Sequence, residues 1–188
     1  VWDTVFAMKS DHLVTVSRDM SLKLIMVETQ RFVDNITSIT PGALKGGLNA
    51  VDRHPAKDEV LVGGSDGTPQ RFQMYRTSAR KIGDNANLLK SYEAMPGRVY
   101  DVRFNADGSR FVAGSSYNGA GEVRVYNTED GKVVSRVAIP EGGVFTVAFH
   151  PNGETVAAGG FDGVVRLFKA ENGELLHSFT PVPLNVEE

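Results

Sequence analysis

The sequence predicts an all-β protein in which four four-stranded antiparallel sheets stack as blades. Four similar units follow one another along the chain, and they begin at Val1, Leu48, Val99 and Val144. Each unit holds four short strand patterns separated by polar turns, and no helical periodicity of useful length interrupts them. A repeat of about 45 to 50 residues is typical of β-blades, each of which needs a neighbour to cover its faces. We therefore expect a portion of a β-propeller.

Because the repeat fills the chain, residues 1–188 are expected to form a single β-propeller region. The expected blades are 1–47, 48–98, 99–143 and 144–182, followed by a C-terminal tail at 183–188. The net charge of -3 offers no basic field to a nucleic acid. No apolar run reaches the roughly 18 residues of a membrane span, and a chain without cysteine has no thiolate metal site. We expect a soluble protein with no nucleic-acid partner, no membrane insertion and no cofactor.

The innermost strand of each blade is expected at residues 1–6, 48–53, 99–104 and 144–149. Alternate positions such as Tyr100, Val102 and Phe104 place large apolar side chains on one face of the sheet. Asn49 interrupts this pattern in the second unit. Asp-Gly and Asn-Gly turns follow the innermost strands of the last two units, and they indicate antiparallel hairpins.

The second strands are expected at residues 13–17, 60–64, 111–115 and 156–160. They consist of apolar and small residues, which is typical of strands covered on both faces. The third strands, at 22–25, 70–72, 123–126 and 165–168, each carry a cation at what we interpret as one position: Lys23, Arg71, Arg124 and Arg166. The fourth strands, at 31–33, 88–92, 133–137 and 175–179, are more polar, which suits an outer edge. Residues 117–121 are expected in a connection.

Three segments of the fourth unit carry a specific resemblance. They read Val-Phe-Thr-Val-Ala-Phe-His-Pro-Asn-Gly at 144–153, Ala-Ala-Gly-Gly-Phe-Asp-Gly at 157–163 and Val-Arg-Leu-Phe at 165–168. These segments are similar to the WD-repeat family of β-propellers, which the third unit also resembles and the first two resemble in degenerate form. The position of the family's Trp-Asp pair holds Tyr126-Asn127 and Phe168-Lys169 in the last two units. The family's hydrogen-bond tetrad of His, Asp, Ser and Trp is therefore incomplete here.

A second resemblance concerns the first unit. Residues 14–19 and 31–47 are similar to propeller regions of large multidomain bacterial proteins from planctomycete-like lineages. In such proteins a propeller lies beside haem-binding or immunoglobulin-like domains, which would lie outside the present chain.

The WD-repeat resemblance implies a non-enzymatic scaffold that binds another protein or a neighbouring domain of its own polypeptide. It also implies a peptide-binding face around the central opening of the propeller. Aromatic and arginine side chains suit such a face because they desolvate a large area with little loss of entropy. The candidates precede the turn aspartates or lie near the start of the innermost strands: Arg18, Ser65, Phe161, Trp2, Asn49, Tyr100 and Phe145. The alternation equally allows Trp2, Tyr100 and Phe145 to be core residues between blades.

The alternative function is a propeller enzyme or a cofactor- or metal-binding propeller with a site at the channel mouth. Asp3, Asn49 and Asp101 could contribute to such a site. The string Gly-Gly-Ser-Asp-Gly at 63–67 fits the G-x-S-x-G pattern of serine hydrolases. That pattern acts at a turn from a strand to a helix, whereas a second strand is expected here, so we interpret the string as a structural turn.

Two further groups of polar residues are expected to be structural. His54 and His150 each precede a proline at one repeat position, where a side chain can close a turn. Asp19, Asp66 and Asp162 lie shortly before the cations of the third strands, where an ion pair or an Asx-turn explains them.

Assembly follows from the number of blades. Four stacked blades leave apolar faces open on the first and last blade unless the ring closes. One expectation is therefore a homodimer in which two copies complete a larger ring.

Overall fold

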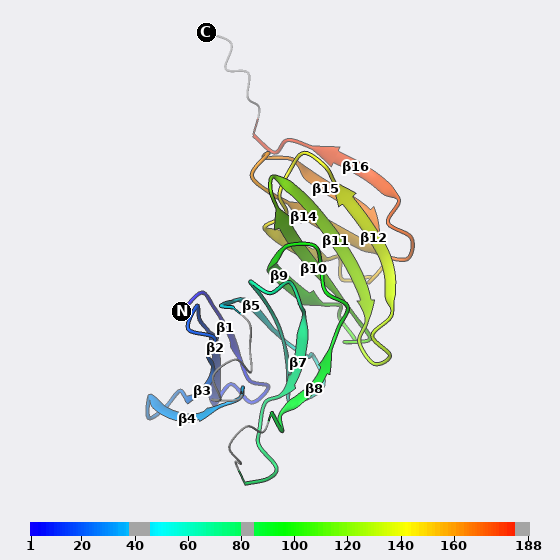
Figure 1. The fold of residues 1–188 in the computed structure, drawn as a ribbon. Coiled ribbons are helices and arrows are strands. Elements are labelled where there is room, and N and C mark those ends of the chain that lie inside the picture. Colours follow the sequence, from blue (N-terminus) through cyan, green and yellow to red (C-terminus); the bar gives the residue numbers. More distant parts are fainter. Residues whose placement is uncertain (38–45, 80–84, 183–188) are drawn as a thin grey trace.

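The computed structural model describes residues 1–37, 46–79 and 85–182, and it confirms the expected all-β fold. In this part of the chain there are sixteen strands in four four-stranded antiparallel sheets. The sheets follow one another in chain order, and the first and last sheets lie at opposite ends of the molecule (Figure 1). The expected tail at 183–188 lies outside the described residues.

Each sheet is a meander in which strands pair in chain order from the innermost to the outermost. Blade 1 contains β1 (Asp3–Phe6), β2 (His12–Val16), β3 (Leu22–Met26) and β4 (Arg31–Asn35). Blade 2 contains β5 (Leu48–Arg53), β6 (Glu59–Gly64), β7 (Gln70–Gln73) and β8 (Leu88–Ser91). Blade 3 contains β9 (Arg98–Phe104), β10 (Arg110–Tyr117), β11 (Ala120–Asn127) and β12 (Val133–Ile139). Blade 4 contains β13 (Thr146–Phe149), β14 (Thr155–Gly159), β15 (Val165–Lys169) and β16 (Leu175–Phe179).

The hydrophobic core lies between the blades, in three separate clusters. Between blades 2 and 3, for example, Leu61 belongs to the same buried cluster as Phe111 and Tyr126. The rings of Phe111 and Tyr126 stack with centroids 4.8 Å apart. The innermost strands contact one another in the same order, β1 with β5, β5 with β9 and β9 with β13. Each pair of neighbouring blades therefore buries the faces that meet between them, as the repeat predicts.

Two glycines allow neighbouring blades to approach closely. A Cβ atom on Gly63 would lie 2.3 Å from Cγ1 of Val99, and one on Gly114 would lie 2.6 Å from Cγ1 of Val144. In both cases the valine belongs to the next blade, so a side chain at the glycine would push the sheets apart. Gly159 holds the same position in blade 4, where a Cβ would meet only its own blade's Thr146, at 3.5 Å.

Two details of the prediction are wrong. Residues 117–121 are not a loose connection, because β10 and β11 pair as far as Tyr117 and Ala120. Asn118 and Gly119 both have positive φ, of 51° and 84°, which is the backbone of a two-residue hairpin turn that continues the ladder.

The second error concerns the cation of blade 2. Lys23, Arg124 and Arg166 pair with Thr15, Ala113 and Ala158, which are equivalent positions of the second strands. Arg71 instead pairs with Leu61, one residue closer to the start of its second strand. The irregularity between β7 and β8 directly follows Arg71, just as the one between β11 and β12 directly follows Val125. Arg71 thus holds the position of Val125, which packs in the cluster between blades 3 and 4. Arg71 therefore faces blade 3.

The described residues contain no helix that is long and apolar enough to cross a membrane.

Candidate protein-interaction surface

The candidate residues lie where the chain enters each innermost strand and where the second strand turns into the third. Gly47 and Gly143 lie directly before blades 2 and 4, next to such turns. A Cβ on Gly47 would lie 2.8 Å from Cα of Arg18 in the preceding blade. A Cβ on Gly143 would lie 2.3 Å from Oγ of Ser116 and 3.2 Å from the ring of Phe161. The glycines thus bring the turns of adjacent blades close to the starts of the innermost strands.

Three of the seven candidates form a continuous aromatic cluster across blades 3 and 4. The rings of Tyr100 and Phe145 meet edge to face with centroids 4.9 Å apart, and those of Phe145 and Phe161 are 6.2 Å apart. Phe145 is 43% exposed and Phe161 is 63% exposed. Edge-to-face contacts hold such rings in place. We call Tyr100, Phe145 and Phe161 the aromatic cluster.

Two further candidates meet on blade 1. The Arg18 guanidinium lies 5.3 Å from the ring centroid of Trp2, within the range of a cation–π contact. Trp2 is 57% exposed. This pair and the aromatic cluster belong to different blades, and no contact joins them among the described residues. Sequence alternation left Trp2, Tyr100 and Phe145 as either core or surface, and the structure exposes Trp2 and Phe145 while Tyr100 is half-buried.

The remaining candidates are more deeply placed. The Asn49 side chain donates a 2.8 Å hydrogen bond to the carbonyl of Val99, directly before Tyr100 in blade 3. Asn49 therefore joins two blades. Ser65 is half-buried and its backbone N–H donates to the carbonyl of Gly47 at 2.9 Å. The structure does not place Ser65 against any other candidate side chain.

An ion pair supports the turn that carries Phe161. Arg166 Nη2 lies 2.6 Å from Asp162 Oδ2, and Asp162 Oδ1 accepts from the N–H of Val164 at 3.1 Å. The hydrogen bond from Arg166 lowers the pKa of Asp162 below its ordinary value. This is the ion pair and Asx-turn that the sequence predicts, and it holds Phe161 on a fixed turn.

The two other turn aspartates also have structural contacts. Asp19 accepts from the N–H of Ser21 at 3.0 Å and lies 3.7 Å from Lys23. Asp66 accepts from the N–H of Thr68 at 3.0 Å, so it forms the predicted Asx-turn. Arg71 forms ion pairs with Glu59 and Glu129.

Aspartates of the innermost strands join one blade to the next. Asp3 Oδ2 accepts from the N–H of Val51 at 3.0 Å, and Asp52 Oδ2 accepts from that of Phe104 at 2.7 Å. Asp101 Oδ2 accepts from the N–H of Val147 at 2.9 Å. Burial raises the pKa of both Asp52 and Asp101. The acidic residues that a channel-mouth enzyme would use therefore hold backbone amides of the following blade.

The residues that matched catalytic patterns occupy turns. The string at 63–67 begins with the last two residues of β6 and continues into the turn before β7, so it lacks the strand-to-helix context of a nucleophile elbow. Nδ1 of His54 and Nδ1 of His150 accept from the backbone N–H two residues later, at 3.1 and 3.2 Å. Both histidines thus close turns, as predicted. Within residues 1–37, 46–79 and 85–182, no group of three or more His, Cys, Asp or Glu side chains is placed to hold a metal ion.

One exposed aromatic residue at this end of blade 3 was not predicted from the sequence. Tyr117 is 61% exposed at the tip of the β10–β11 hairpin. A Cβ added to Gly97 would lie 2.7 Å from the Cβ of Tyr117. Tyr117 thus lies beside the segment that enters β9. The Asn-Gly pair that follows it was the signal for a tight hairpin.

The model of the family "WD domain, G-beta repeat" matches residues 86–127 and 131–169. The first match contains β8 to β11 and the second contains β12 to β15. Each matched repeat therefore combines the outermost strand of one blade with three strands of the next.

Three curated relatives share part of this chain. The WD repeat-containing protein VIP3 of Arabidopsis thaliana is 29% identical over 50% of the chain and 33% of its own length. The guanine nucleotide-binding protein subunit beta of Arabidopsis thaliana is 30% identical over 42% of the chain and 20% of its own length. The serine-threonine kinase receptor-associated protein of Bos taurus is 29% identical over 50% of the chain and 24% of its own length.

The chain thus spans only 20 to 33% of the length of these relatives. All three are eukaryotic, so the resemblance to bacterial multidomain proteins stays a prediction.

Proposed function

Because the chain belongs to the WD-repeat family, we propose that it is a non-enzymatic scaffold that binds another protein, or a neighbouring domain of its own polypeptide, through the aromatic cluster. Two of the relatives are named as a subunit and as a receptor-associated protein, which supports an interaction role. Interaction surfaces on such proteins are built from loops that a rigid set of sheets holds in place.

The exposed rings of Phe145 and Phe161 carry this proposal. They lie side by side on two different segments, the start of β13 and the turn between β14 and β15. Large rings that stay exposed in a chain with buried cores between blades are typical of a binding surface. We propose that the same surface extends toward blades 1 and 2 through the Arg18–Trp2 pair, Asn49 and Ser65.

Selection of peptides from a random 12-residue displayed library tests the proposal. We expect enriched peptides whose affinity falls by about tenfold or more in the Phe145→Ala/Phe161→Ala double variant, because buried aromatic anchors dominate such interfaces. Leu89→Ala is the control, since Leu89 is an exposed apolar side chain on the outermost strand of blade 2. Peptides that bind the double variant as tightly as the wild type would contradict the proposal.

We also propose that a second copy of the chain covers the open ends of the blade stack and completes a larger ring. Phe6, Leu13, Ile25 and Phe32 are cross-strand neighbours on blade 1. The equivalent row of blade 3, which includes Phe111 and Tyr126, is buried against blade 2. In blade 1 this row is not covered, and Phe6 and Phe32 are 54% and 61% exposed.

The opposite end offers the matching face. On blade 4 the face beyond Gly159 is uncovered, whereas Gly63 and Gly114 receive valines of the next blade. Val1 holds the repeat position of those valines in blade 1, and it is 80% exposed. Two head-to-tail contacts between two copies would close a symmetric ring. The division into blades at 1–47, 48–98, 99–143 and 144–182 is part of this proposal.

Sedimentation equilibrium of the wild type and of Phe32→Glu tests the paired ring. We expect a concentration-dependent dimer in the wild type and a monomer in the variant, because the new carboxylate would be buried without a partner. Val27→Glu on an exposed turn is the control. A wild-type protein that stays monomeric at about 100 μM, where even a weak specific dimer forms, would show that a second copy does not cover these faces.

A further inference from the structure

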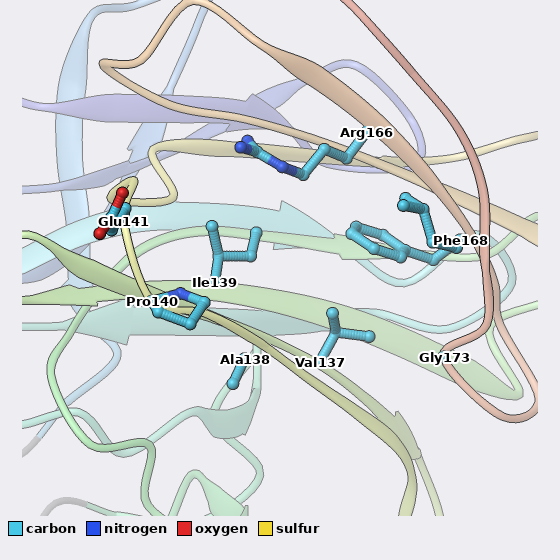
Figure 2. A pocket seen from close by; sticks show the side chains of 9 residues that line it. Val137, Ala138, Ile139, Pro140, Glu141, Arg166, Phe168 and Gly173 are labelled. Atoms are coloured by element: carbon cyan, nitrogen blue, oxygen red, sulfur yellow. The ribbon is translucent and has the colours of Figure 1, made fainter.

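A groove opens between blades 3 and 4 on the side of the outer strands. Its volume is about 560 Å³, and its apolar wall includes Val137 and Ile139 of β12, Phe168 of β15 and Leu175 of β16. Phe168 faces Val137 across the groove, with Arg166 above Ile139 and Glu141 at the other end (Figure 2). The groove therefore has an apolar end and a charged end.

The molecule fills the equivalent place between blades 2 and 3 with an aromatic ring. Tyr92 holds the position of Val137. Tyr92 follows Ser91, which pairs with Gln70, and Val137 follows Arg136, which pairs with Arg124. Gln70 and Arg124 are equivalent residues of the third strands. The Tyr92 ring lies 4.6 Å from that of Phe111 and 5.9 Å from that of Tyr126. Phe168 is the counterpart of Tyr126 in blade 4. The interface of blades 2 and 3 therefore holds the buried phenol of Tyr92 at this position, whereas the interface of blades 3 and 4 holds Val137 beside the groove.

An arginine holds the chain that follows this ring. Arg124 Nη1 donates to the carbonyl of Ala94 at 2.8 Å and to Oε1 of Glu93 at 3.1 Å. Arg166 occupies the same position in blade 4 and lines the groove. Its Nη2 pairs with Asp162, and its Nη1 has a contact of 3.5 Å to the carbonyl of Val164. A guanidinium carries five N–H donors, so Arg166 can also donate to a further oxygen.

We propose that this groove binds an extended peptide segment that inserts one aromatic side chain between Val137 and Phe168 and accepts a hydrogen bond from Arg166. The segment Tyr92-Glu93-Ala94-Met95 of the chain itself shows the chemistry of the occupant. An aromatic side chain supplies the buried area, and a carbonyl or carboxylate one or two residues later meets the guanidinium. None of the three rings of the aromatic cluster lines the groove, so a partner could use both sites at once.

A labelled peptide with the sequence of residues 89–97, Leu-Lys-Ser-Tyr-Glu-Ala-Met-Pro-Gly, tests the proposal by fluorescence anisotropy. We expect saturable binding to the wild-type protein, weakened about tenfold or more when the peptide tyrosine is replaced by alanine. Val137→Tyr should abolish binding, because the new ring fills the groove as Tyr92 does at the preceding interface. Val27→Tyr, the same substitution on an exposed turn, should leave binding unchanged.

Photo-cross-linking gives a second readout that does not depend on the folding of Val137→Tyr. With benzoylphenylalanine in place of the peptide tyrosine, we expect adducts on residues 137–141 or 168–175 of the wild-type protein. Adducts confined to the aromatic cluster or to the interface of blades 2 and 3 would overturn the proposal. It would equally fail if the peptide shows no saturable binding up to about 1 mM, the weak limit of specific recognition, or binds Val137→Tyr as well as wild type.

The two proposals can fail separately. Phe145→Ala/Phe161→Ala should leave the affinity of the labelled peptide unchanged, because neither ring lines the groove. If sedimentation shows a dimer that Val137→Tyr abolishes, the occupant is a second copy and the peptide proposal is wrong.

Discussion

Replacing Asp101 by alanine should destabilise the protein strongly, because this side chain joins blade 3 to blade 4. Its Oδ2 accepts from the N–H of Val147 at 2.9 Å and from Oγ1 of Thr146 at 3.1 Å. Its Oδ1 accepts from the N–H of Val102 at 3.0 Å. Val102 and Val147 are both buried, so water does not readily replace the lost acceptor.

The expected loss follows from these two amides. A buried N–H without a partner costs about 1 to 3 kcal/mol, so the variant should lose about 2 to 6 kcal/mol of unfolding free energy. For a chain of this size, about 4 kcal/mol corresponds to a fall in melting temperature of about 8 to 16 °C. Asp101→Asn keeps one acceptor oxygen and should lie between the alanine variant and the wild type.

Urea denaturation followed by circular dichroism, together with calorimetry, measures the effect. Asp58→Ala is the control, since Asp58 is exposed. It should stay within about 0.5 kcal/mol of the wild type. If Asp101→Ala shows the same stability as Asp58→Ala, the carboxylate does not hold the two blades together and the reasoning fails.

Three further predictions concern the interfaces between blades. Gly114→Ala should lose about 1 to 3 kcal/mol, because the new methyl group would lie 2.6 Å from a valine of blade 4. Gly159→Ala should unfold like the wild type in the dilute monomer, and equal losses at both glycines would show that the blade-4 face is not open. Burial raises the pKa of Tyr92 and Tyr126 from 10.0 to about 12, so these phenols stay neutral to a higher pH in the folded state than in the unfolded state. Stability should therefore fall as pH rises from 10 to 12, by about 2 to 3 kcal/mol per tyrosine, and absorbance titration that shows both phenols ionising near pH 10 in the folded protein would contradict this. Hydrogen bonds from Arg71 and Lys57 lower the pKa of Glu129 from 4.5 to about 2, so its contribution is present above pH 4.5 and is lost as pH falls toward 2. Because Glu129 is largely exposed, that contribution is at most about 1 kcal/mol, and Glu129→Gln should remove it, whereas an unchanged acid transition in the variant would contradict the ion pair.

Most of the fold could be predicted because its signals are local. Alternation over five or six residues, together with Asp-Gly and Asn-Gly turns, determines where strands begin and how they pair. β5 agrees with the predicted range of 48–53 at both ends. The register of Arg71 was predicted wrongly although the sequence holds a signal for it. Asp66 precedes Arg71 by five residues, whereas Asp19 and Asp162 precede Lys23 and Arg166 by four. This spacing places Gln70, rather than Arg71, at the position of the other cations.

The candidate surface was only partly predictable for a different reason. Alternation places Phe145, Val147 and Phe149 on one face of a strand, and it does not say how far the neighbouring blade extends along that face. In the structure β13 begins at Thr146, so Phe145 lies before the strand and is exposed, while Val147 is buried. The groove beside Val137 could not be predicted either, because it depends on comparing two interfaces between blades in space.

Hydrogen–deuterium exchange with a peptide selected on the wild-type protein tests the central claim most directly, since it locates the binding surface without any substitution. The proposed function predicts slower exchange at the start of β9 and β13 and in the turn that carries Phe161, on binding. Protection confined to the outermost strands, with unchanged exchange at these three places, would contradict it.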